Sequence, residues 1–191
     1  MSKAICVFCS SSDSIAPIYF GVANELGAML ARRGMALVYG GSNIGLMGTV
    51  ARAVHAHSGC VIGVIPQTIH ARGIAYDTAD ELIVTRDLRE RKATMEARAD
   101  GFIALPGGFG TLEEVVEVIT LKQLQTHDKP IILLNTEGFY DPLIALFEHF
   151  YEQRFAKPDQ RQLYHFAPDI DSVFAYLDSY EPPQIENKWF G

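Results

Sequence analysis

Two adjacent carboxylates follow a glycine-rich turn in the middle of the chain. Residues 104 to 115 read A-L-P-G-G-F-G-T-L-E-E-V, so Glu113 and Glu114 come directly after Gly107, Gly108, Gly110 and Thr111. Such glycines let backbone N–H groups approach an anion closely, and a threonine here can cap the following helix and donate its hydroxyl to a phosphate. Carboxylates in a first helical turn also offset the helix dipole without any ligand. Beside an anion they fit only if a carboxylate faces another part of the same ligand.

A basic pair lies just upstream of this turn. Arg91 and Lys92 belong to a charged segment, Asp87 to Arg98, whose spacing predicts a helix. Glu96 follows Lys92 by four residues, so their side chains can pair on that helix. Charged segments of this kind are usually solvated helix faces. This one leads directly into the strand that carries the glycine turn, and that proximity makes the basic pair a candidate for the same site.

Two further turns are candidates for a binding site. Ser10 lies in C-S-S-S-D after the first expected strand, where small hydroxyl residues either bind a phosphate or cap a helix. Gly41 and Ser42 lie in Y-G-G-S-N-I-G-L-M-G after the second strand. This second turn is not a P-loop, because no Gly-Lys-Ser/Thr closes it, and it lacks the spacing and position of the dinucleotide fingerprint. Helix capping and a tight turn without a ligand stay open as explanations.

Short apolar runs alternate with longer amphipathic segments along the chain. The expected strands are residues 4–8, 36–39, 61–65, 82–85, 101–105 and 131–134, and the expected helices are residues 18–33, 46–57, 88–99, 111–125, 142–154 and about 170–179. Nearly continuous apolar strands, each followed by a helix, predict an α/β fold: a Rossmann-like, doubly wound parallel sheet with helices on both faces. In such sheets ligands bind beyond the carboxyl ends of the strands, where the three turns lie.

No linker interrupts this alternation, which predicts a single domain over residues 1–180 and a tail over residues 181–191. Residues 66–80 contain Pro, Gly and polar side chains and are typical of a long functional loop or a short irregular helix. The tail begins E-P-P and is expected to be extended or disordered. Trp189 and Phe190 are able to anchor it to a neighbour.

Composition excludes several classes of protein. A hydrophobic content of 48% in 191 residues predicts a globular protein, and a formal net charge of -7 argues against a general nucleic-acid binder. No apolar run is long enough to span a bilayer, and the N-terminus lacks a signal-peptide pattern. Three cysteines form no even disulfide set, so we expect a cytoplasmic protein. The C-x-x-C formed by Cys6 and Cys9 lies in a strand and its exit turn, which predicts buried thiols rather than a redox pair.

The motifs together resemble the LONELY GUY family of cytokinin-activating phosphoribohydrolases, long labelled "possible lysine decarboxylase". The family pattern P-G-G-x-G-T-x-x-E is intact from Pro106 to Glu114, and Arg91-Lys92 matches its companion. Further matches are C-V-F-C-S-S, V-Y-G-G-x-x-I-G-L-M-G, V-I-G-V-I-P and H-D-K-P, in the right order over about residues 4 to 155. The chain departs from the common family pattern at Leu88-Arg89, at Ser42 and near Gly73, which leaves the base substituent open.

The resemblance implies hydrolysis of the N-glycosidic bond of a nucleoside 5′-monophosphate, giving an adenine-type base and ribose 5-phosphate. It also implies a homodimer with the site near the interface, and neither a metal nor an organic cofactor. Cleavage builds positive charge on the ribose, which a fixed carboxylate can stabilise. The predicted catalytic residues are Glu114, Arg91 and, less strongly, Arg98. The predicted substrate-binding residues are Lys92, Glu113, Gly107, Gly108, Gly110, Thr111, Gly41, Ser42, Ser10, Met95 and Thr120.

Two other functions fit these residues less well. A pyridoxal-dependent decarboxylase needs a Schiff-base lysine with a partner for the pyridine nitrogen, and none of Lys92, Lys122 and Lys129 has such a setting. A non-catalytic nucleotide or molybdenum-cofactor carrier would share the glycine turns. It would have no need for Glu114 together with Arg91, so the presence of both favours the enzyme.

Overall fold

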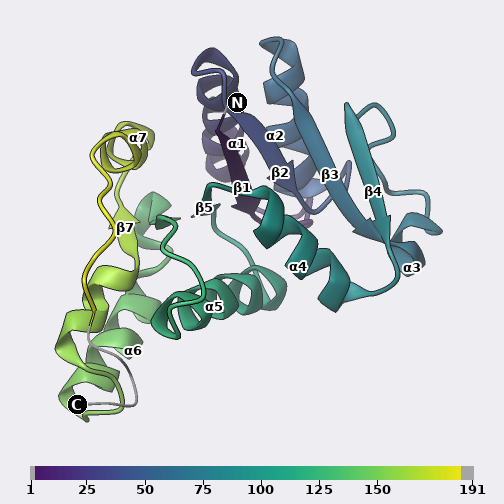
Figure 1. The fold of residues 1–191 in the computed structure, drawn as a ribbon. Coiled ribbons are helices and arrows are strands. Elements are labelled where there is room, and N and C mark those ends of the chain that lie inside the picture. The colour runs from purple at the N-terminus through teal and green to yellow at the C-terminus, as the bar shows by residue number, and fades with distance from the viewer. Residues whose placement is uncertain (1–2, 186–191) are drawn as a thin grey trace.

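The central feature of the fold is one seven-stranded sheet, seen in a computed structural model that describes residues 3–185 (Figure 1). Every neighbouring pair of strands is parallel, and the order across the sheet is β4-β3-β2-β1-β5-β6-β7. The strands are β1 (Ala4–Phe8), β2 (Ala36–Tyr39), β3 (Val61–Pro66), β4 (Glu81–Thr85), β5 (Gly101–Ala104), β6 (Ile131–Leu134) and β7 (His165–Ala167). The predicted parallel α/β sheet is therefore confirmed.

Helices cover both faces of the sheet. On one face lie α1 (Pro17–Arg32), α2 (Gly45–Ala56) and α7 (Ile170–Asp178), and on the other lie α4 (Leu88–Arg98), α5 (Phe109–Gln123) and α6 (Asp141–Glu152). Alternate residues of each strand point to opposite faces, so Ile5 and Val7 join the first core while Cys6 and Phe8 join the second. This two-sided burial explains why the strand sequences are continuously apolar.

The helix starts follow from local side-chain chemistry. Asp87 precedes α4, and its carboxylate accepts the backbone N–H groups of Arg89 and Glu90, each at 2.9 Å. Asp169 caps α7 in the same way by accepting from Ser172 N. These caps satisfy N–H groups that have no partner inside the helix.

The structure adds elements that the sequence pattern did not predict. Strand β7 was missed because its three residues follow a 3-10 helix (Pro158–Leu163) and are too few to show a period. A second 3-10 turn spans Thr136–Gly138. Residues 66–80 contain a short helix, α3 (Gln67–His70), followed by a loop, in line with the second of the two expectations. Residues 181–185 form neither helix nor strand, while Trp189 and Phe190 lie outside the described residues.

The point where the chain reverses direction across the sheet fixes the position of the site. Successive strands β1 to β4 run outward to one edge, and α4 then returns the chain so that β5 pairs with β1 on its other side. The turns after β1 and β5 therefore diverge at the centre of the sheet, and such a divergence opens the crevice in which doubly wound folds bind ligands. None of the described helices is long and apolar enough to cross a membrane.

Candidate active site

A cavity of about 540 Å³ lies at this central crevice. The turn after β1 lines it with Cys9, Ser10, Ser11 and Ser12, and the turn after β2 together with the start of α2 lines it with Gly40, Ser42, Ile44 and Met47. The loop after β3 adds Ile69, Arg72 and Ile74, and the starts of α4 and α5 add Leu88, Arg91, Gly108, Gly110, Thr111 and Glu114. Its size suits a nucleotide-sized ligand.

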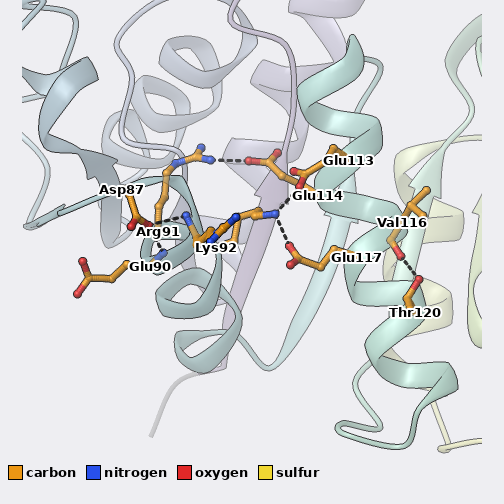
Figure 2. A network of polar contacts seen from close by, with 10 residues as sticks. Asp87, Glu90, Arg91, Lys92, Glu113, Glu114, Val116, Glu117 and Thr120 are labelled. Atoms are coloured by element: carbon orange, nitrogen blue, oxygen red, sulfur yellow. Dashed lines mark hydrogen bonds and ion pairs between the residues drawn. The ribbon is translucent and has the colours of Figure 1, made fainter.

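A buried ion pair forms one wall of the cavity. Arg91 Nη1 donates to Glu114 Oε1 at 2.6 Å (Figure 2). Arg91 Nε donates to the backbone oxygen of Val64 at 3.0 Å. The two side chains come from different helices, α4 and α5, and each is less than a tenth exposed. The second bond, to a strand carbonyl, fixes the guanidinium, and the guanidinium in turn fixes the carboxylate that faces the cavity.

Gly40 makes room for this guanidinium. A Cβ atom at position 40 would lie 2.2 Å from Arg91 Nη2 and 2.9 Å from Met47 Sδ. Any larger residue would push Arg91 out of its place between β3 and Glu114. The conformation of the ion pair therefore depends on a glycine in the turn after β2, which α2, β3, α3 and β4 separate from α4 along the chain.

The buried position also changes the acidity of Glu114. Burial raises the pKa of this carboxyl above its ordinary value, and the guanidinium of Arg91 opposes that rise through charge and hydrogen bonding. The opposition is incomplete, so the pKa of Glu114 stays raised. A carboxylate with a raised pKa is a stronger base than an exposed one, which suits it to accept a proton from water.

Lys92 binds two other carboxylates of α5. Its ammonium group pairs with Glu113 and with Glu117 Oε2, the latter at 2.9 Å (Figure 2). Burial lowers the pKa of Lys92, but the hydrogen bonds that its ammonium group donates to both glutamates outweigh this effect, and the pKa is raised overall. The prediction that Lys92 pairs with Glu96 on its own helix is wrong, because α5 presents two carboxylates one helical turn apart directly across from it.

The N-terminus of α5 is open toward the cavity. The helix begins at Phe109 with Gly108 as its N-cap, and no side chain caps it. The prediction of Thr111 as the cap is therefore wrong, because the helix continues through the glycines and places Thr111 inside the first turn, where it is buried. Gly107 is needed for that packing, since a Cβ atom there would lie 2.1 Å from Thr111 Oγ1. Helix N-termini left open in this way attract anions.

The N-terminus of α2 is closed by comparison. The backbone N–H of Gly45 donates to the carboxylate of Asp13 at 2.9 Å, and that of Leu46 donates to Ser10 O, also at 2.9 Å. Ser42 Oγ donates weakly to Ile74 O and accepts from Ile44 N. Both glycine turns reach the crevice, but at α2 the turn after β1 already occupies the positions where a phosphate would bind.

Comparison with known proteins places the chain in a family. A family model described as "possible lysine decarboxylase" matches residues 47–177. A protein of Oryza sativa subsp. japonica named probable cytokinin riboside 5′-monophosphate phosphoribohydrolase is 45% identical over 94% of this chain and 74% of its own length. An Arabidopsis thaliana cytokinin riboside 5′-monophosphate phosphoribohydrolase is 46% identical over 94% of this chain and 84% of its own. The chain belongs to the LONELY GUY family.

Solved structures support the fold alone. The molybdenum cofactor carrier protein of Chlamydomonas reinhardtii superposes with a TM-score of 0.69 at 24% identity over 93% of this chain and 97% of its own. The molybdenum cofactor binding protein of Rippkaea orientalis superposes with a TM-score of 0.71, also at 24% identity, over 94% of this chain and 97% of its own. The decarboxylase label finds no support in the cavity, because none of the described lysines lines it.

The structure brings most of the predicted LONELY GUY site residues together. Arg91, Glu114, Ser10, Ser42, Gly108, Gly110 and Thr111 line the cavity, and Gly41 and Gly107 belong to the same turns. Lys92 and Glu113 bind each other beside the cavity without lining it.

Three predicted site residues lie elsewhere. Arg98 is at the far end of α4, where it pairs with Glu81 at the start of β4, so it lies at the opposite end of the strands from the cavity. Met95 is packed in the core between α4 and the sheet. Thr120 donates to Val116 O within α5 and lines a separate groove between α5 and α6. Each residue step along a helix rotates the side-chain direction by about 100°, so two residues on the same helix do not necessarily face one site.

Other cavity residues were missed from the sequence. Gly40 and Arg72 are the most informative, because one accommodates Arg91 and the other adds a positive charge. Arg72 could have been predicted from the sequence, because it lies in the loop after the third strand and all strands of a parallel sheet end at the same edge. Gly40 lies in the second candidate turn beside Gly41, but nothing in the sequence indicated its contact with Arg91, which is 51 positions away.

Proposed function

We propose that this protein hydrolyses the N-glycosidic bond of N6-substituted adenosine 5′-monophosphates, releasing the free base and ribose 5-phosphate. The observation that carries the proposal is the buried Glu114–Arg91 pair, which faces the same cavity as the open N-terminus of α5. The names of the close relatives agree with this reaction. The proposed chemistry needs no metal or organic cofactor.

The 5′-phosphate is proposed to bind at the N-terminus of α5. Its two negative charges meet the N–H groups of the first turn, the partial positive charge of the helix and the hydroxyl of Thr111. Glu114 lies on the second turn of the same helix, so a ribose attached to this phosphate would extend toward it. In this arrangement the backbone N–H groups bind the phosphate, and the carboxylate of Glu114 faces the positive charge that develops on the ribose.

Glu114 is proposed to act on the ribose and on water. As the C1′–N9 bond lengthens, positive charge grows on C1′ and O4′, and an ionised carboxylate nearby stabilises it. The same carboxylate can take a proton from the water that adds to C1′. Arg91, bonded to Glu114 and to the Val64 carbonyl, keeps that carboxylate oriented.

The decisive experiment compares turnover with binding. Incubation with AMP and with its N6-isopentenyl analogue should yield free base and ribose 5-phosphate in equal amounts, detected by chromatography. A non-catalytic carrier of a nucleotide or of the molybdenum cofactor would bind ligand without releasing base. Binding of both nucleotides without turnover of either would exclude the hydrolase.

We also propose that the protein is a homodimer with the cavity near the interface. An apolar stripe runs along the exposed side of α5 from the cavity mouth, formed by Phe109, Leu112 and Val116, with Phe109 95% exposed. It leads toward a groove between α5 and α6 that contains Phe150 and the 87% exposed Phe155. Continuous exposed apolar surface of this kind marks interaction sites. Light scattering should give twice the chain mass, and Val116→Glu should yield monomers; a monomeric wild type would exclude the dimer.

A cytoplasmic location is the corresponding proposal for the compartment. The three cysteines are free, two of them buried, as expected for a protein kept in a reducing environment. Fluorescence microscopy of a tagged chain would test it, and a secreted or membrane-associated signal would contradict it.

A further inference from the structure

Arg72 occupies a defined place on the cavity wall. It follows α3 in the loop after β3, and this loop is tied to the turn after β2 by two backbone bonds of 2.9 Å. Asn43 N donates to Ile74 O, and Tyr76 N donates to Gly41 O. The segment that carries Arg72 is therefore attached to the site, although the side chain itself is exposed.

Arg72 brings an uncompensated positive charge to the cavity. Among the described residues that line it, only Arg72 and Arg91 are cationic. Two nitrogens of Arg91 are engaged, and the charge of Arg91 is balanced by Glu114. The guanidinium of Arg72 forms no hydrogen bond or ion pair with any residue that the structure describes. It is thus the cation available for a ligand.

The order of the sheet sets Arg72 at the opposite side of the cavity from the proposed phosphate site. Strand β3 lies three positions from β5, which is about 14 Å at a spacing of about 4.8 Å per strand. With phosphate at α5 and C1′ beside Glu114, the base extends toward β3. There it meets apolar side chains of the cavity wall, among them Ile44, Met47, Ile69, Ile74 and Leu88.

We propose that Arg72 is a catalytic residue that stabilises the departing base, an inference that rests on the proposed function. When the C1′–N9 bond breaks, its electron pair moves to the base, and the oxygen of water bonds to C1′. One water proton goes to Glu114 and is finally taken up by the base, so that a single water is consumed. Until then the base carries negative charge on its ring nitrogens, and a guanidinium that donates hydrogen bonds to them lowers the barrier. Arg72 acts as a donor only, because a guanidinium does not give up its proton in proteins.

Two substrates with different leaving groups test this role. Arg72→Gln should lower kcat for AMP about 10²-fold, as removal of one transition-state donor does. The same variant should change kcat for 4-nitrophenyl β-D-ribofuranoside 5-phosphate by less than about threefold, since nitrophenolate leaves without help. Arg89→Gln, at an exposed arginine in the first turn of α4 that does not line the cavity, is the matched control and should leave both rates unchanged. Equal losses on both substrates, or no loss on AMP, would overturn the proposal.

Binding measurements separate failure of this inference from failure of the proposed function. If the wild-type protein cleaves neither substrate, the hydrolase is excluded, and calorimetry with adenine and with ribose 5-phosphate then tests the position of Arg72. Weaker binding of adenine alone by Arg72→Gln supports its place at the base. Weaker binding of ribose 5-phosphate alone assigns it to the phosphate and overturns the inference.

Discussion

Two ion pairs join the same two helices side by side, yet they differ in almost every physical respect. Arg91 and Lys92 are neighbours on α4, and Glu114 and Glu113 are neighbours on α5 (Figure 2). The Arg91–Glu114 pair is buried and lines the cavity, whereas Glu113 is more than half exposed and neither member of its pair lines the cavity. One residue step along each helix separates the proposed catalytic pair from a pair that links the helices.

The comparison explains how carboxylates can lie beside an anion site. Glu114 is paired with Arg91, and Glu113 shares Lys92 with Glu117, so most of the negative charge near the N-terminus of α5 is offset before any ligand binds. Burial then distinguishes the two glutamates, because a charge held away from water interacts more strongly with both its partner and a substrate cation. We therefore expect changes to the buried pair to have large effects and changes to the exposed pair to have small ones.

The largest expected effect is the loss of activity in Glu114→Gln. The amide keeps an oxygen that can accept from Arg91, but it can neither stabilise a cation as a charge nor accept a proton from water. We expect kcat to fall about 10²- to 10⁴-fold with little change in KM. Base release under saturating AMP measures this, with circular dichroism as the folding control. Activity within tenfold of wild type would remove Glu114 from the reaction.

Removal of the buried cation should affect stability most. Arg91→Met leaves Glu114 buried without its partner and should cost roughly 3 kcal/mol of unfolding free energy. Lys92→Met, the matched change in the neighbouring pair, should cost less than about 1 kcal/mol, because its partners are largely solvated. Urea denaturation of both variants gives the comparison. Similar losses would mean that burial does not distinguish the pairs.

The pH dependence of activity should reveal the raised pKa of Glu114. Glu114 must be ionised to act, so the rate should fall as pH falls through its pKa in the folded protein. Burial raises that pKa, so the acid limb should lie above about 4.3, the ordinary value for glutamate. Arg91→Met removes the charge that opposes this rise and should move the limb to higher pH. Profiles of kcat/KM measure both, and an unmoved limb would assign it to another group.

The sequence was sufficient to predict the parallel sheet and the turns that line the site. The apolar strand runs and the glycine turns are local signals that can be read from the sequence. Because ligands of parallel sheets bind beyond the carboxyl ends of the strands, these signals also indicate where the site lies. The sequence was not sufficient to predict which carboxylate is buried or which carboxylates Lys92 binds, because adjacent residues on a helix differ only in direction. Arg98 and Met95 show the same limit: both lie on the correct helix, and each faces away from the cavity.

The smallest expected effect is that of a substitution at Glu113. In Glu113→Gln, Lys92 keeps its bond to Glu117 at 2.9 Å, so α4 and α5 stay linked. Because the carboxylate does not line the cavity, we expect kcat/KM for AMP to stay within about threefold of wild type, less than 1 kcal/mol. A direct contact with the ribose would instead raise KM at constant kcat. Steady-state kinetics of Glu113→Gln and Glu117→Gln, measured side by side, separate these outcomes: a higher KM in Glu113→Gln alone makes Glu113 a substrate ligand, and equal small changes in both make them helix-linking residues.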